Sequence, residues 1–404
     1  MPDTFRVTTY ELEANTFTGT TYDITLNNDL ESNYFVMING GAEGNTTRGP
    51  SSNFIRVSAD PFGTGTLGTS SGADVITLAR PDTVDAWIGT ICVVECLGDE
   101  SASGFTLLDV VELNFTPSSS TSDTATSGTA WSDINQVGLY GGIRGGGVAV
   151  NNISSAASGA GHARIYPSGS DTINGSRDLT GKTAEVADFT VYVVEWGSEW
   201  TIQRVNATGT AGGAGANSST HYVTGAITSA TRDNTFVLGY GHTNDGGIGD
   251  SFSGRLVTLG DGQTQNASET VVSCGGEYSD TVDVEIYVHE HADLAVDYVF
   301  QIDGNSTALT FDHTVDAALS SETYNTTATV STTEGYRVGI QYNGCNGTGT
   351  AYPRPYWGAR HTASTTMNVM RGYQGQSWPA WVQSADFSGI TYEAGGARRI
   401  FHVL

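Results

Sequence analysis

The chain has 404 residues, of which 43 are Asp or Glu and 17 are Lys or Arg, giving a formal net charge of -26 at pH 7. Proteins that bind phosphate groups cluster Lys and Arg, so this balance argues against nucleic acid as a partner. No run of about 18 apolar residues occurs in the sequence, so no membrane-spanning helix is expected.

Two strand-like segments recur along the chain at nearly constant spacing. The first is FRVTTYELE (5–13), FTLLDVVEL (105–113), WTIQRVNAT (200–208), YVFQIDGNS (298–306) and RRIFHVL (398–404), at steps of 95 to 100 residues. The second is NYFVMINGG (33–41), NQVGLYGG (135–142), NTFVLGYG (234–241) and GYRVGIQYNG (335–344). Two markers that share one period indicate stacked copies of one structural unit.

Each copy has two further marks. An Arg follows the second marker at Arg56, Arg164, Arg255 and Arg360, and an acid-ending strand covers 87–95, 189–195, 284–290 and 381–386. Apolar alternation between Gly-, Asn- and Ser-containing turns is typical of strands, and about 100 residues suit a small sandwich. We therefore predict an all-β fold of four tandem small antiparallel β-sandwich domains at 1–116, 117–220, 221–317 and 318–404.

The repeated acids are predicted to be structural. Glu95, Glu195 and Glu290 end equivalent strands, and each is expected to pair with the Arg of its own unit, Arg56, Arg164 or Arg255. A catalytic role would need a second carboxylate nearby. Asp85, Asp188 and Asp283 lie at the far ends of the same strands, over about 20 Å away in an extended chain. An Arg–Glu pair within each sandwich is the better interpretation.

Other candidates for chemistry are weak. The string Gly68–Gly72 fits G-x-S-x-G around Ser70, but that motif needs a strand-to-helix turn in an α/β sheet. His289 and His291 lie two apart on one strand and could hold a metal ion. Their equivalents are Val94 and Cys96 in the first unit and Val194 and Trp196 in the second. We predict no catalytic residue, no metal site and no cofactor, so the protein is not expected to be an enzyme.

Cysteines and aromatic residues add little to this. Cys92 and Cys96 share a strand face about 13 Å apart, too far for a disulfide, while Cys274 and Cys345 could meet across an interface or stay reduced. The fourth unit is rich in aromatic side chains and is expected to make contacts, either with another subunit or with sugar rings. Its aromatic residues are Tyr352, Tyr356, Trp357, Tyr373, Trp378, Trp381 and Tyr392.

The charge pattern also suggests a habitat. Lys182 is the single lysine, and abundant carboxylates hold water and hydrated cations at molar salt, where charges are screened within about 3 Å. This is typical of halophilic proteins, although an ordinary acidic protein would show the same sign. Residues 1–17 contain acids and no apolar stretch of the kind that a secretion signal has, so export by that route is not expected.

Taken together, these features resemble the surface structural proteins of haloarchaeal tailed viruses and related tailed phages. The resemblance rests on acidic, Lys-poor, tandem β architecture over the whole chain and on no single motif. It implies a non-enzymatic virion protein on the particle exterior, such as a capsid turret, spike or decoration protein, assembled in the host cytoplasm. Expected partners are other virion proteins, further copies of the chain as a homo-oligomer, and a host surface glycan or glycoprotein during attachment.

Two alternatives remain open at this point. A tail fibre or baseplate component belongs to the same class. A glycan-binding cell-surface adhesin belongs to another class and would need an export signal.

Overall fold

The computed structural model describes residues 3–42, 55–80, 83, 87–145, 162–180, 186–210, 222–243, 257–261, 266–275, 281–303, 310–314, 337–343, 357–363, 366–371 and 379–392. Within these residues the protein is nearly all β, without an α-helix. Two single-turn 3-10 helices are present, η2 (Ile134–Gln136) and η4 (Arg232–Asn234). The all-β class predicted from the sequence is confirmed.

Strand pairing divides the described strands into four sets that follow one another along the chain. The first set has β1 (Phe5–Phe17), β2 (Thr21–Thr25), β3 (Tyr34–Ala42), β4 (Arg56–Asp60), β5 (Gly68–Thr69), β6 (Val75–Ala79) and β7 (Trp87–Cys96). The second has β8 (Phe105–Asn114), β9 (Ser122–Thr126), β10 (Val137–Gly145), β11 (Arg164–Ser168), β12 (Thr172–Ser176) and β13 (Ala187–Trp196).

The third set has β14 (Thr201–Thr210), β15 (Tyr222–Thr231), β16 (Thr235–Thr243), β17 (Val257–Leu259), β18 (Ser268–Gly275) and β19 (Thr281–Glu290). The fourth has β20 (Ala295–Asp303), β21 (Thr310–Thr314), β22 (Arg337–Asn343), β23 (Trp357–Ala363), β24 (Thr366–Arg371) and β25 (Pro379–Asp386).

Each set contains two small sheets with the same strand order. In the sheet that we call axial, the last strand of the set lies between the first and the third: β1-β7-β3, β8-β13-β10, β14-β19-β16 and β20-β25-β22. In the peripheral sheet the fifth strand lies between the second and the fourth: β9-β12-β11, β15-β18-β17 and β21-β24-β23, with β2-β6-β4-β5 in the first set. All pairs are antiparallel except the short pair β4 and β5.

This pairing has a consequence for the predicted boundaries near residues 116, 220 and 317. Strands β8, β14 and β20 lie before those boundaries in the sequence. Each nevertheless pairs with a strand that lies after the boundary, namely β13, β19 and β25. A sequence period gives the length of a repeat but not the residue at which the repeat begins. The division of the chain into four domains stays a prediction.

The two sheets pack face to face in the second and third sets. In the second set, a Cβ added at Gly175 of β12 would lie 2.8 Å from the ring of Phe115 and 3.1 Å from Leu113. In the third set, a Cβ at Gly225 of β15 would meet Val205 of β14 at 2.3 Å. Glycine at these positions therefore allows the sheets to approach closely.

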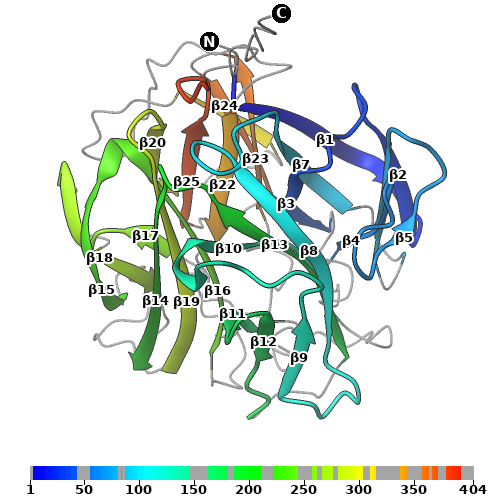
Figure 1. Cartoon of the computed structure of the whole chain (residues 1–404), viewed down its shortest axis with the longest axis horizontal. Helices are drawn as coiled ribbons and strands as arrows, with labels where there is room; N and C mark the ends of the chain where they lie inside the picture. Colours follow the sequence, from blue (N-terminus) through cyan, green and yellow to red (C-terminus); the bar gives the residue numbers. More distant parts are fainter. Residues whose placement is uncertain are drawn as a thin grey trace, which may run out of the picture.

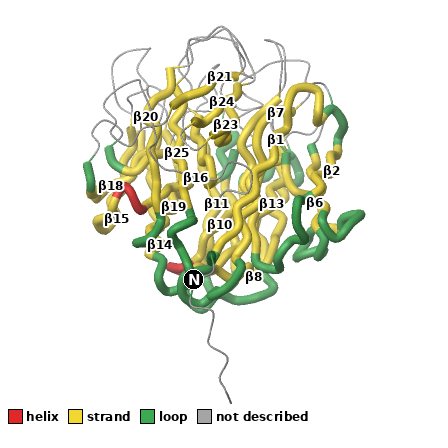
Figure 2. The backbone as a smooth tube through the Cα atoms, turned by 90° about the horizontal axis from the view of Figure 1, so that it is seen from above, coloured by secondary structure: helices red, strands yellow, loops and turns green. Residues whose placement is uncertain are grey.

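The four sets form a closed ring, and Figure 1 shows them as blue, cyan, green and orange sectors. β4 packs against β10 and β13, β11 against β16 and β19, η4 and β16 against β20, and β23 and β24 against β3 and β7. The ring closes through its ends, since Thr4 N–H donates to Ile390 O at 3.0 Å and Asp3 pairs with Thr391. Figure 2 shows the same strands in a view turned by 90° from that of Figure 1.

An aromatic cluster lies where the axial sheets converge. It is built from Phe5 and Phe35 of the first set, Phe105 and Trp196 of the second, Trp200 and Phe236 of the third, and Phe387 just after β25. The ring centroid of Phe5 lies 5.9 Å from that of Phe105 and 5.1 Å from that of Phe387. The ring centroids of Trp196 and Trp200 are 4.2 Å apart. All four sets thus contribute to one hydrophobic core.

Candidate functional site

The repeated acids at the ends of the central axial strands bind backbone amides. Glu95 accepts from Glu31 N at 2.9 Å, Glu195 from Ser132 N and Asp133 N at 2.8 Å, and Glu290 from Thr231 N at 2.8 Å. These amides all lie in the segment that leads into the third strand of the set. Because a carboxylate satisfies otherwise unpaired N–H groups, the three acids hold equivalent loops in place.

The partners predicted for Arg56 and Arg164 were wrong. Arg56 on β4 pairs with Glu112 at 2.8 Å, and Arg164 on β11 pairs with Glu285 at 2.8 Å. Both acids belong to the following set, because β4 and β11 are the peripheral strands that face it. Arg255 and the side chain of Arg360 lie outside the described residues. The repeated Arg therefore links neighbouring sets.

Arg6 is the cation that the sequence did not single out. Its guanidinium contacts Glu95 at 2.6 Å within the first set, and the hydrogen bond to Glu95 raises the pKa of Arg6. β1 and β7 place the two residues directly opposite one another. A cross-strand pair of this kind depends on the register, which a strand-like sequence pattern does not give.

The densest charged group lies between the second and third sets. The Glu285 carboxylate contacts Arg164 and, at 3.1 Å, Arg204 Nε, while Asp283 accepts from Asn206 Nδ2 at 2.9 Å. Burial raises the pKa of Glu285, and Arg164 partly opposes that shift. Two guanidinium groups therefore bind the Glu285 carboxylate in the folded protein.

The two histidines considered as metal ligands are buried, and each is engaged within the core. His289 Nε2 and Tyr140 Oη share a hydrogen bond of 2.7 Å, and Tyr140 Oη accepts from Trp196 Nε1 at 2.8 Å. Burial lowers the pKa of His289 to about 3, with an opposing contribution from the Phe236 backbone. His291 Nδ1 accepts from Asp293 N at 3.1 Å. Neutral histidine is therefore part of the hydrophobic core.

The sequence could not have revealed this Trp196–Tyr140–His289 network. Tyr140 and His289 are 149 residues apart and belong to different sets. The equivalents of Tyr140 are Met37 and Leu238, as the strand registers show. No periodic signal marked the position, because the hydroxyl group occurs in one copy only.

Ser70 of the G-x-S-x-G string lies in the loop after β5. Its amide donates to Asp60 O at 2.8 Å and its hydroxyl to Gly72 O at 2.9 Å. A nucleophile elbow places serine on a tight turn between a strand and a helix. Here the hydroxyl only stabilises a loop between two strands.

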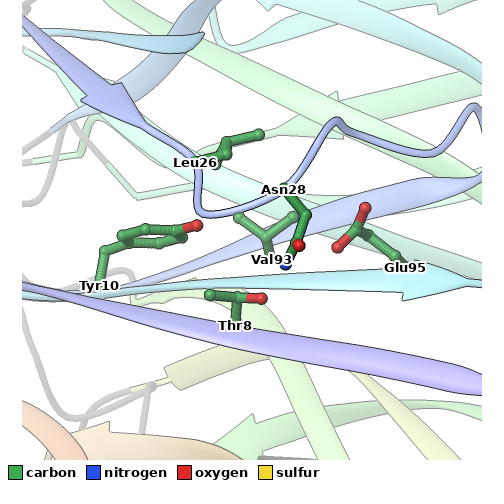
Figure 3. A pocket seen from close by; sticks show the side chains of 6 residues that line it. All are labelled: Thr8, Tyr10, Leu26, Asn28, Val93 and Glu95. Carbon is green, nitrogen blue, oxygen red and sulfur yellow. The ribbon is translucent and has the colours of Figure 1, made fainter. Parts of the chain in front are cut away.

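A shallow recess lies beside the repeated acid of the first set, and Figure 3 shows it from close by. Thr8 and Tyr10 of β1, Val93 and Glu95 of β7, and Leu26 and Asn28 of the loop after β2 line about 170 Å³ of space, which includes open solvent. Small-molecule sites commonly enclose about 300–1,000 Å³. The recess is too small for such a ligand.

The described residues contain no group of three or more His, Cys, Asp or Glu side chains arranged to hold a metal ion. No helix in that part of the chain is long and apolar enough to cross a membrane. Phe62 and Leu97 are its exposed large apolar side chains, at 49% and 37%.

Several predicted features fall elsewhere. Of the seven aromatic residues singled out in the fourth unit, only the Tyr392 side chain belongs to the described residues, where it packs over Gly98. The strand expected at 398–404 lies outside them. Cys92, Cys96 and Cys274 are buried, and burial raises the pKa of Cys274 to about 12. Cys345 lies outside the described residues.

Comparisons with family models, with curated proteins and with solved structures find no match for this chain.

Proposed function

We propose that this protein is a non-enzymatic structural component of a virion exterior, such as a capsid turret, spike or decoration protein. The proposal rests on the contacts that the repeated polar residues make. Carboxylates that would be candidates for catalysis bind backbone amides at equivalent places in three sets, and the repeated Arg residues join one set to the next. These repeated polar residues therefore stabilise a rigid framework.

The charge of the chain supports an exterior position in a salty medium. With 43 acidic and 17 basic residues, the surface repels other copies at low salt and binds hydrated cations at high salt. Assembly into a homo-oligomer on the particle would therefore strengthen with rising salt. The shared aromatic cluster adds a framework in which each set supports its neighbours.

We also propose that the four sets are four β-sandwich units that have become parts of one body. The equivalent strand orders, the equivalent acids and the face-to-face sheets of the second and third sets favour this view. Sandwiches of about 100 residues are a common building block of surface proteins. Their closed arrangement gives a compact structure that would suit a turret or decoration protein.

The proposal is tested on purified virus particles from a host that carries the gene. Antibodies against the recombinant chain are applied to intact particles, and gold labelling is examined by electron microscopy. We expect label on the head surface, and peptides of the chain in the mass spectrum of the particles. The matched control is antibody absorbed with the purified protein.

Labelling at the tail would favour the tail fibre or baseplate alternative. Particles without the chain, together with label on the cell envelope, would overturn the virion assignment and favour the adhesin.

A further inference from the structure

The outward face of the peripheral sheet β9-β12-β11 is a regular array of small polar side chains. The register places three residues side by side in each of three rows across the strands. The rows are Ser122, Ser176 and Arg164; Thr124, Asn174 and Tyr166; and Thr126, Thr172 and Ser168. We call these nine residues the hydroxyl face. Figure 1 shows the three strands at the lower rim of the ring.

The opposite side of the same sheet is the buried one. Ile165 and Ile173 are almost fully buried, at 1% and 0% exposure, and Gly175 packs on Phe115. By contrast, Ser122, Thr124 and Thr126 are exposed, and the other six residues of the face are half-buried. The alternation of a strand thus directs every member of the hydroxyl face away from the core.

The face is neutral, although the chain as a whole is strongly acidic. Its one charged residue, Arg164, pairs with Glu285 and stacks over the Tyr166 ring, with its guanidinium carbon 4.2 Å from the centroid. Asp123, next to the face in sequence, points away from it and accepts from Asn114 N at 2.6 Å. The nine residues include no carboxylate, although Asp171 borders the face and accepts from Thr172 Oγ1 at 3.1 Å.

The equivalent sheets of the other described sets differ. In the first set, the central position of the edge strand is Asp23, which bonds Thr77, and Ala79 and Val75 interrupt the polar rows. In the third set, Thr258 and Ser273 are buried, at 2% and 0% exposure. Among the three sets whose peripheral side chains are described, the uncharged hydroxyl face is therefore found in the second.

The array offers hydrogen-bonding groups at fixed spacings. Neighbouring residues lie about 4.8 Å apart across the strands and about 6.8 Å apart along them, so the face spans roughly 10 by 13 Å. Hydroxyl groups both donate and accept, and an amide does the same through separate atoms. The hydroxyls of Thr124 and Thr126 make no hydrogen bond to other described residues, whereas Asn174 Nδ2 donates to Ser168 Oγ at 2.7 Å.

We propose that the hydroxyl face binds a neutral polysaccharide chain. Sugar hydroxyls match a surface of Ser, Thr and Asn groups, and the Tyr166 hydroxyl adds a further partner. A neutral polymer suffers no repulsion from a protein of charge -26, whereas an anionic polymer must approach against that field. The inference rests on the proposed exterior role for its place in attachment, but the binding itself requires no particle.

The test is affinity electrophoresis of the purified full chain in native gels that contain dextran, galactomannan or xylan. Alginate serves as the anionic comparison. We expect retardation by at least one neutral polymer and not by alginate. Removing two hydroxyls through Thr124→Val together with Thr126→Val should weaken that binding about ten-fold, since each bond contributes a modest free energy. Both substitutions keep a β-branched side chain on a strand.

Thr224→Val is the matched control, because Thr224 is an exposed threonine on β15 of the third set. It should leave the binding unchanged. A second variant, Thr124→Asp, introduces the acid that the first set has at the equivalent position, and should also reduce binding while the melting temperature stays close to that of the parent.

The inference fails if no neutral polymer retards the chain, if alginate alone does, or if Thr224→Val weakens binding as much as the double variant. If this inference fails but the virus heads carry the gold label, the proposed function still stands. Binding by the hydroxyl face without any virion label would support this inference and remove the proposed function.

Discussion

The buried histidine in the core gives a prediction with a calculable size. His289 has a pKa of about 3 in the folded protein and 6.5 in the unfolded chain. The folded pKa is the lower one, so between pH 6.5 and 3 the unfolded state binds the additional proton. Stability therefore falls as the pH decreases through this window.

The magnitude follows from the difference between the two pKa values. At pH 4.5 the unfolded imidazole is protonated and the folded one is neutral, which costs about 2.5 kcal/mol relative to pH 7. Tyr140, Trp196, Phe236 and Tyr287 surround the ring, and none of them is charged at these pH values.

The assay is urea denaturation at pH 7 and at pH 4.5, for the parent and for His289→Gln. Glutamine keeps an acceptor for Tyr140 Oη but does not titrate. Other groups also titrate in this range, so the quantity of interest is the difference between the two proteins. The loss of unfolding free energy on acidification should be about 2.5 kcal/mol smaller in the variant. Equal losses would refute the buried neutral histidine.

Three further predictions concern the core and the turns. Phe105→Ala should destabilise the protein by about 3–5 kcal/mol and keep a single unfolding transition, because Phe105 contacts aromatic rings of two sets; calorimetry that resolves separate transitions would contradict the shared core. Gly197→Ala would place a Cβ 2.2 Å from Ala102 O and should cost about 1–3 kcal/mol in denaturant titrations; an unchanged midpoint would count against this packing. Cys92, Cys96 and Cys274 are buried, so they should react with a thiol reagent only in denaturant, and rapid labelling of peptides that contain them in the native protein would show the burial to be wrong.

The sequence predicted the fold class well because strand alternation and a constant period are local signals. The acids at Glu95, Glu195 and Glu290 lie at equivalent strand ends, as their spacing indicated, and bind backbone amides. Their partners could not be found in the same way. Arg56 and Glu112 lie on separate sets, and their pairing depends on how the sets pack against one another. The starting residue of each repeat was similarly hidden, since β8 follows β7 in the chain but pairs with β13.

The hydroxyl face shows a second limit of sequence analysis. Ser, Thr and Asn around residues 122–126 and 164–176 appear in the sequence as ordinary turn and strand composition. Only the register aligns Thr124 with Asn174 and Tyr166. A polar array that depends on three strands cannot be recognised from any one of them.

The contact between Thr4 and Ile390 has a consequence for how such a protein avoids polymerising. Open arrays of repeats expose an uncovered apolar face at each end and need specialised terminal repeats to stay soluble. A circle of four sets has four interfaces where an open row would have three, and it has no end to cover. The contacts of Asp3 and Thr4 with Ile390 and Thr391 thereby take the place of capping repeats in this circle.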